Sequence, residues 1–139
     1  MIASSVSHWN DCHFCHSSHG AAAANLRKEP VGFLKEIKNG FPNTDVSPKM
    51  RALLIIAKHV QKGGKNVTEE DIASARDAGA SDKEIHDTVL IAAAFCMYNR
   101  YVDGLDTWQP RDEALYRERG KKTAREGYVS MSREYLPAK

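Results

Sequence analysis

The chain has 139 residues, which is enough for one domain and too few for two. Hydrophobic residues make up 42% and charged residues 27%, a composition that supports a folded core and excludes a disordered chain. The 20 Lys and Arg residues nearly balance the 18 Asp and Glu residues. The net charge of +2 therefore excludes a protein whose main task is electrostatic binding of nucleic acid or of a membrane surface.

The longest apolar run covers residues 89–98, about half of the ~20 residues that a membrane-spanning helix needs. The first residues lack the basic start and the apolar stretch of a signal peptide, so we expect a cytoplasmic protein without a membrane partner. In that compartment, two cysteines close together in sequence serve redox catalysis or metal binding more often than a permanent disulfide.

Helical patterns occur along the chain, and no alternating run of β-branched residues predicts a strand, so the expected fold class is all-α. Residues 1–9 have the pattern of the end of a helix. Asn10 or Asp11 is expected to cap a second helix that runs to about Leu26. A short helix is expected over residues 31–38.

The next two helices have clear start signals. Ser47 is a favourable N-cap and Pro48 a favourable first residue of a helix, which is expected to end at Gly63. Thr68 begins a capping-box-like sequence with acidic residues in the first turn, and this shorter helix is expected to end near Gly79.

The longest helix is expected to begin at a capping box formed by Ser81 and Glu84 and to run to about Val102. Its central residues, 89–98, are apolar on every side. A helix of this kind is expected at the buried centre of the fold.

Pro110 precedes a charged helix expected over residues 111–126, and residues 127–139 are expected to be irregular. The predicted organisation is thus a single helical bundle over residues 1–108, followed by a charged C-terminal helix and tail over residues 109–139.

Residues 12–19 contain the pattern C-x-x-C-x-x-x-H, formed by Cys12, Cys15 and His19. On a helix these three side chains share one stripe, with His16 at its edge. A thiolate attacks peroxides, a helix N-terminus lowers the pKa of a thiol, and a histidine one turn away can relay the proton. The attacked cysteine would become a sulfenic acid and condense with the other to a disulfide, which an external dithiol must reduce.

Two other interpretations of these residues stay open. Cys12, Cys15 and His19 are also suitable zinc ligands, with His8, His13 or His16 as a fourth, which would make the chain a non-enzymatic metal-binding or redox-sensing module. Against zinc, the sequence has no second ligand cluster. Residues 12–16 also match the C-x-x-C-H attachment motif of c-type haem, which requires export of the protein.

The cysteine–histidine motif at the start of an Ala-rich helix, together with the long-helix ending over residues 95–105, resembles one family. This is the alkylhydroperoxidase D-like branch of the carboxymuconolactone decarboxylase superfamily, in particular its peroxidase-related members. The resemblance covers residues 1–108. It implies an all-helical homo-oligomer (dimer, trimer or hexamer) that reduces hydroperoxides with an external dithiol and without metal or haem. The cysteine pair counts against lactone decarboxylation, the superfamily's other activity.

The resemblance implies that Cys12 and Cys15 are the redox pair and that His19 is the proton relay. By analogy Cys15 attacks the peroxide and Cys12 resolves the sulfenic acid, whereas the helix-dipole argument favours Cys12 as the more acidic thiol. The family's relay glutamate on the preceding helix has no counterpart, so we expect a family core that lacks the upstream part of its first helices. Asp11, His8 and His16 are the candidate substitutes.

Overall fold

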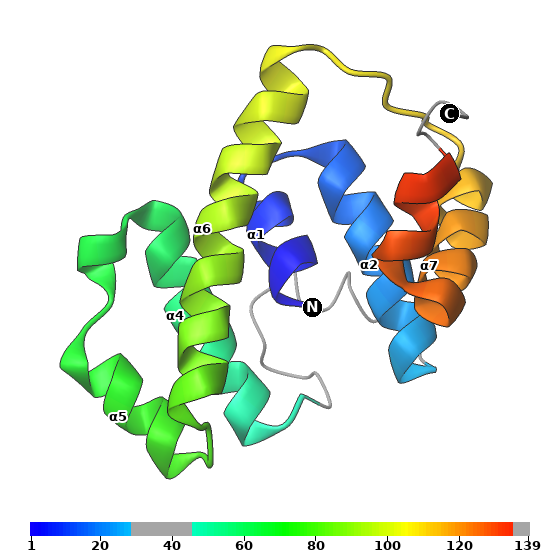
Figure 1. Ribbon diagram of the computed structural model, residues 1–139. Coiled ribbons are helices and arrows are strands. Elements are labelled where there is room, and N and C mark those ends of the chain that lie inside the picture. Colours follow the sequence, from blue (N-terminus) through cyan, green and yellow to red (C-terminus); the bar gives the residue numbers. More distant parts are fainter. Residues whose placement is uncertain (29–45, 135–139) are drawn as a thin grey trace.

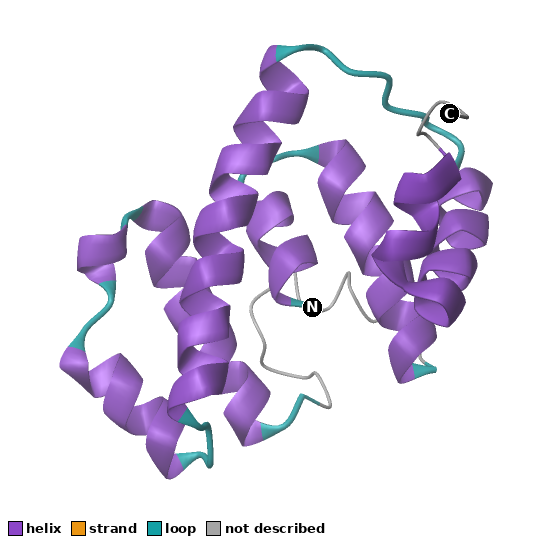
Figure 2. Ribbon diagram, viewed as in Figure 1, coloured by secondary structure: helices purple, strands orange, loops and turns teal. Residues whose placement is uncertain are grey.

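The computed structural model describes residues 1–28 and 46–134, with side chains up to residue 129. This part of the chain contains helices and no strand, as the sequence predicts (Figures 1 and 2). The helices are α1 (Ile2–Trp9), α2 (His13–Arg27), α4 (Pro48–Lys62), the short 3₁₀ helix η1 (Gly64–Asn66), α5 (Glu69–Asp77), α6 (Asp82–Gly104) and α7 (Glu113–Glu134). The short helix expected over residues 31–38 lies outside the described residues.

Helix α1 lies at the centre of the molecule and packs against α2, α4 and α6 (Figure 1). On one side, α4 and α6 pack together with α5, and on the other side α7 packs against α2. The start of α2, where the cysteine motif lies, is therefore held between the central helix and the C-terminal helix.

The main hydrophobic core is centred on α4 and α6. Fully buried residues of α4, such as Leu53, Ile56 and Ala57, pack with Val6 of α1 and Ala92 of α6. Burial of an aliphatic side chain of this size stabilises a fold by roughly 1.5–3 kcal/mol. This core fixes α1, and through it the turn that leads into α2.

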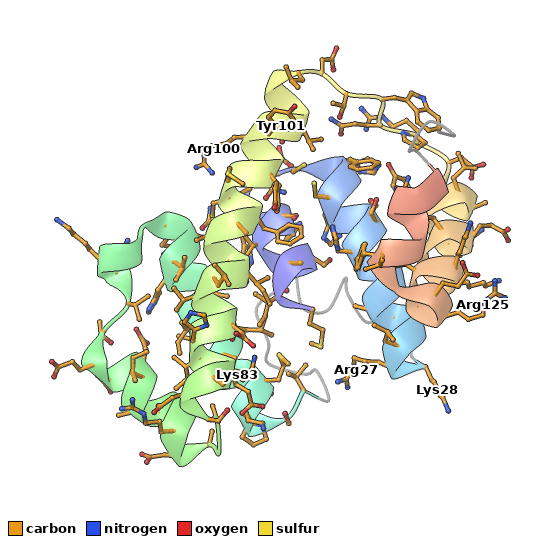
Figure 3. All side chains as sticks on the ribbon, in the orientation of Figure 1. Arg27, Lys28, Lys83, Arg100, Tyr101 and Arg125 are labelled. Carbon is orange, nitrogen blue, oxygen red and sulfur yellow. The ribbon has the colours of Figure 1, made fainter. Side chains whose placement is uncertain are left out.

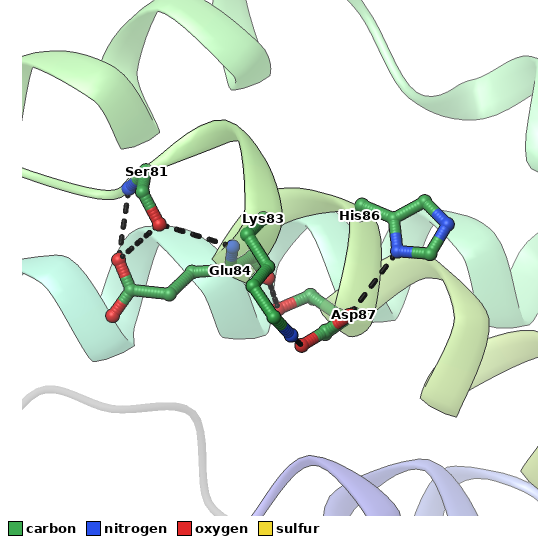
Figure 4. A network of polar contacts seen from close by, with 6 residues as sticks. Ser81, Lys83, Glu84, His86 and Asp87 are labelled. Carbon is green, nitrogen blue, oxygen red and sulfur yellow. Dashed lines mark hydrogen bonds and ion pairs between the residues drawn. The ribbon is translucent and has the colours of Figure 1, made fainter.

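The start signals of three helices are confirmed. The Ser47 side chain accepts a hydrogen bond from the backbone N–H of Met50 at 3.2 Å. The capping boxes that begin α5 and α6 are both complete. Figure 4 shows the α6 box, in which the Ser81 backbone N–H donates to Glu84 at 2.8 Å.

The predicted cap of α2 is wrong by one or two residues. The N-cap is Cys12, and Asn10 instead ends α1. Asp11 lies between them with φ 58°, a left-handed conformation that Asp tolerates better than most residues. The two helices are therefore joined by a tight turn, which leaves Asp11 outside α2.

The prediction that α6 is buried on every side is also wrong within the described chain. Its buried residues are Ile85, Thr88, Ala92 and Asn99, which lie on the side facing the other helices. Leu90, Met97, Tyr98 and Tyr101 are exposed apolar side chains. Figure 3 shows Arg100 and Tyr101 near the end of α6 that leads into the connection to α7.

Helix α7 is longer than predicted. It runs from Glu113 to Glu134, with non-helical backbone angles at Gly127 (φ 73°, ψ 175°). Glycine adopts a positive φ at little cost, so the chain bends there and continues as a helix where the sequence predicts an irregular end. The bend brings the following residue, Tyr128, back to α2. Among the described residues, no helix has both the length and the apolar character needed to cross a membrane.

Candidate active site

The turn before α2 is fixed by a chain of side-chain hydrogen bonds. Asn10 donates to Asn99 of α6 at 2.9 Å, and Gln61 of α4 donates to Asn10 at 2.9 Å. Asn99 is buried and itself donates to Ser7 at 3.0 Å. Carboxamide and hydroxyl groups from α1, α4 and α6 therefore hold the turn two residues before Cys12.

Backbone hydrogen bonds complete the turn. The Cys12 N–H donates to the carbonyl of Ser7 at 2.9 Å, and the His16 N–H donates to the carbonyl of Cys12 at 3.0 Å. Cys12 is thus the residue at which the chain enters α2, and Cys15 lies in the first turn of that helix. Both cysteines thus lie at the N-terminus of α2.

Cys12 and Cys15 are buried free thiols, with 1% and 4% of their surfaces exposed. Burial is the main cause that raises the pKa of Cys12 to about 12; the Asp103 carboxylate and the Cys15 thiol contribute to this rise, and the Cys15 backbone N–H opposes it. Cys12 is therefore a protonated thiol at neutral pH. This observation opposes the helix-dipole argument for Cys12 as the attacking thiolate.

His19 lies one helical turn after Cys15, between aromatic side chains of two other helices. Phe95 of α6 meets its ring edge-on at 4.6 Å between centroids. The Tyr128 hydroxyl of α7 is hydrogen-bonded to His19 Nδ1 at 2.6 Å. Burial, together with the positive charges of the N-terminal amine and Arg119, lowers the pKa of His19 to about 4. The imidazole is therefore neutral at pH 7 and able to accept a proton.

Among the candidate substitutes for the relay glutamate, His16 and His8 lie together, and His16 is bound to helix α1. The Nδ1–H of His16 donates to the carbonyl of Ser4 on α1 at 3.0 Å, and the His16 ring lies 5.2 Å from the ring of His8. His16 is therefore directed to α1. Asp11 is exposed in the turn.

The structure brings three further residues to the site that the motif does not contain. Asp103, at the end of α6, lies beside Cys12. Tyr116 of α7 is buried, and its ring packs against the rings of His13 and Phe14, the two residues between the cysteines, at 5.7 and 6.2 Å between centroids. Tyr128 is the hydrogen-bond partner of His19. Only Asp103 had a signal in the sequence, since it lies within the long-helix ending that carries the family resemblance.

An apolar cavity of about 560 Å³ adjoins His19 between α2, α6 and α7. Its lining includes Ala22, Ala23, Ile91, Phe95 and Tyr128. A concave apolar space beside a small number of polar groups is the usual form of a site for a small organic molecule. His19 and Tyr128 are polar groups on this wall.

The metal-binding interpretation finds no support in the described residues. Nowhere in residues 1–28 and 46–129 do three His, Cys, Asp or Glu side chains converge in a group that could hold a metal ion. His16, which the zinc interpretation offers as a fourth ligand, is instead hydrogen-bonded to Ser4.

Comparison with known proteins gives a structural relative. No family model matches the sequence, and no curated protein matches it. The fold is similar to that of an alkylhydroperoxidase AhpD core, an uncharacterized peroxidase-related protein from Ralstonia eutropha JMP134, with a TM-score of 0.75 and 26% sequence identity. The similarity covers 86% of this chain, which spans 61% of the length of that protein. The structure thus agrees with the resemblance found in the sequence: the chain has an alkylhydroperoxidase D-like helical fold.

Proposed function

We propose that the chain is a thiol-dependent peroxidase that reduces hydroperoxides through Cys12 and Cys15. The observation that carries the proposal is the position of two adjacent free thiols at the start of α2, one turn before a neutral, partly buried histidine. The similarity of the fold to a peroxidase-related protein supports the same chemistry.

In the first step, Cys15 attacks the peroxide. Its thiol proton passes to the neutral imidazole of His19, and the thiolate attacks the terminal oxygen of ROOH. The O–O bond breaks, Cys15 becomes a sulfenic acid, and the leaving alkoxide takes the proton from His19 to give ROH. The peroxide is reduced by two electrons that Cys15 supplies.

In the second step, Cys12 resolves the sulfenic acid. Its sulfur bonds to the Cys15 sulfur, and the hydroxyl group leaves as water with the proton of the Cys12 thiol. The Asp103 carboxylate beside Cys12 is placed to receive that proton first. An external dithiol then reduces the disulfide and restores both thiols. The high pKa of Cys12 suits a resolving thiol, since it stays protonated while Cys15 reacts.

The test is a hydroperoxide-consumption assay with a dithiol reductant on three single variants. Cys15→Ser is expected to reduce turnover to the background rate. Cys12→Ser is expected to consume one equivalent of peroxide and to stop with a sulfenic acid that dimedone traps. Cys96→Ser is the matched control, because Cys96 lies on α6 outside the pair, and it is expected to keep wild-type turnover.

Turnover at the wild-type rate by a Cys12→Ser, Cys15→Ser double variant would eliminate the proposal. Stoichiometric zinc in the purified protein, measured by elemental analysis, would instead favour the metal-binding module.

A further inference from the structure

Two neighbouring cavities lie along α7 on the side that faces the cysteine motif. The smaller, of about 80 Å³, is lined by Phe14, Ser18, His19, Arg119, Thr123 and Tyr128. The larger, of about 170 Å³, is lined by Phe14, Trp108, Pro110, Leu115, Tyr116 and Arg119. Phe14 and Arg119 line both cavities, so the two cavities lie next to each other.

Arg119 supplies positive charge at the junction of the two cavities. Its guanidinium contributes to the low pKa of His19 and opposes the burial that raises the pKa of Tyr128, so it lies close to both side chains. With the described residues Arg119 forms no ion pair, whereas Arg117 on the same helix pairs with Glu113 at 4.0 Å. Arg119 is an exposed residue that lines both cavities, and a guanidinium in such a position without a carboxylate partner is suited to bind the carboxylate of a ligand.

Ser18 adds a second polar group on the opposite wall. Its Oγ is buried and lacks a hydrogen-bond partner among the described residues, although it lines the smaller cavity. An unpaired buried hydroxyl costs free energy, and nearly all such groups in folded proteins have a partner. A ligand oxygen in the smaller cavity would satisfy the Ser18 hydroxyl and the Arg119 guanidinium at once.

The larger cavity has the properties of a site for an apolar group. Phe14, Trp108, Pro110 and Leu115 form most of its lining. Apolar cavities of roughly 150 Å³ in proteins bind benzene, so this space suits one aromatic ring or a short branched alkyl group. Tyr116 on its wall packs against His13 and Phe14, the residues between the two cysteines, so the body of a bound ligand would lie beside the first turn of α2.

We propose that these two cavities form a binding site for a small organic carboxylate. The carboxylate binds to Arg119 and Ser18, and the apolar body packs against Phe14, Trp108 and Tyr116. If the chain is the peroxidase proposed above, its preferred substrate is a hydroperoxide that carries a carboxylate. This substrate preference rests on the proposed function, whereas the binding of a carboxylate does not.

The test is an NMR titration of the wild-type chain with benzoate and, separately, with its uncharged analogue benzamide. Benzoate is expected to shift the resonances of Ser18, His19 and Arg119 and to bind about tenfold more tightly than benzamide, because a charge-assisted hydrogen bond to Arg119 requires the carboxylate. Arg119→Gln is expected to weaken benzoate to the level of benzamide. Ser18→Ala is expected to weaken it by about threefold through the loss of one hydrogen bond.

Arg117→Gln is the matched control, since it removes the same charge from the same helix at an exposed position that lines neither cavity, and it should leave benzoate binding unchanged. Arg119→Lys checks that the effect depends on the bidentate guanidinium and not on folding, and it is expected to give intermediate affinity. Equal affinity for benzoate and benzamide, equal loss in the Arg117 and Arg119 variants, or no binding of benzoate would overturn the proposal.

Measuring benzoate binding and hydroperoxide turnover on the same protein distinguishes the carboxylate site from the proposed function. Benzoate binding that depends on Arg119 in a chain that reduces no hydroperoxide would support the carboxylate site and eliminate the peroxidase. Turnover of cumene hydroperoxide without Arg119-dependent benzoate binding would support the peroxidase and eliminate the carboxylate site.

Discussion

Helix α2 begins differently from α4, α5 and α6. The latter three begin with a Ser or Thr whose side chain accepts a hydrogen bond from the first turn of the helix. Helix α2 begins with Cys12, which makes no such bond. A side-chain cap satisfies backbone donors at the helix N-terminus and typically stabilises a protein by about 1 kcal/mol.

The difference shows where the molecule gives up local stability. At α2 the positions of capping residues are taken by thiols, so the N-terminal donors and the dipole of the helix act on sulfur. The turn is held instead by the buried hydrogen bonds of Asn10 and Asn99. The start of α2 is therefore stabilised by tertiary contacts, whereas the starts of α4, α5 and α6 are stabilised by local sequence.

The packing of the two regions differs in the same way. Around α4, large aliphatic residues such as Leu53, Leu54 and Ile56 fill the core. Between α2 and α7, small residues allow close approach of the two backbones. A Cβ added at Gly120 would lie 2.7 Å from the backbone carbon of Ala21.

Gly120→Ala is expected to destabilise the contact between α2 and α7. The new methyl group meets backbone atoms, which cannot rotate away, so overpacking should cost about 1–3 kcal/mol of unfolding free energy. Urea denaturation followed by circular dichroism measures it. Gly104→Ala is the matched control, since a Cβ at Gly104 meets nothing within 4 Å, and it should unfold like wild type or at slightly higher urea. Equal stability of the two variants would contradict the close packing of α2 and α7.

Tyr128→Phe tests the tertiary contact to His19. The hydroxyl can donate to Nδ1 or accept from it, so it holds the ring in either neutral tautomer, and phenylalanine can do neither. Loss of one hydrogen bond, about 1 kcal/mol, should lower the rate of peroxide reduction about fivefold. Stopped-flow measurement of the reduced protein with peroxide gives this rate. An unchanged rate would show that the position of His19 does not depend on α7.

The features that the sequence predicts are those that depend on neighbouring residues, and the features that it misses depend on tertiary contacts. The starts of α4, α5 and α6 are predictable because each depends on residues within four positions of one another. The hydrogen bond of Tyr128 to His19 spans 109 positions and depends on a glycine bend that sequence patterns interpret as a helix end. The sequence therefore identifies the cysteine motif, whereas most of the residues that surround the motif are identified only by the packing of α6 and α7 in the structure.

Ser81→Ala measures the contribution of a local cap. Loss of the hydroxyl that accepts from Glu84 N–H at 3.2 Å should cost about 1 kcal/mol in urea denaturation. Ser81→Asp keeps an acceptor and should cost less. Cys12→Ser places a capping oxygen at the start of α2, so it should cost less than Ser81→Ala even though it removes a buried thiol. A larger loss of unfolding free energy for Cys12→Ser than for Ser81→Ala would show that the Cys12 thiol already stabilises the start of α2 more than a capping hydroxyl would.

The smallest expected effect is the pH dependence of the α6 capping box. A hydrogen bond from Lys49 at 2.7 Å, with others from Ser81, lowers the pKa of Glu84 from 4.5 to about 2. Because the pKa is lower in the folded state, the stabilisation is complete above pH 4.5 and is lost as the pH falls toward 2. Both side chains are partly exposed, so salt should weaken the effect.

Urea denaturation of wild type and of Glu84→Gln between pH 7 and pH 3 measures this contribution. The variant is expected to be less stable at pH 7 and to approach wild type at pH 3, because below pH 4.5 the Glu84 side chain of unfolded wild type binds a proton more readily than that of the folded protein. Glu118→Gln, an exposed carboxylate change on α7, is the control and should leave the difference from wild type nearly constant. Parallel pH curves for wild type and Glu84→Gln would contradict the ionic bond between Lys49 and the capping box. The α6 start would then depend on Ser81 alone, and its contrast with α2 would reduce to one hydroxyl against one thiol.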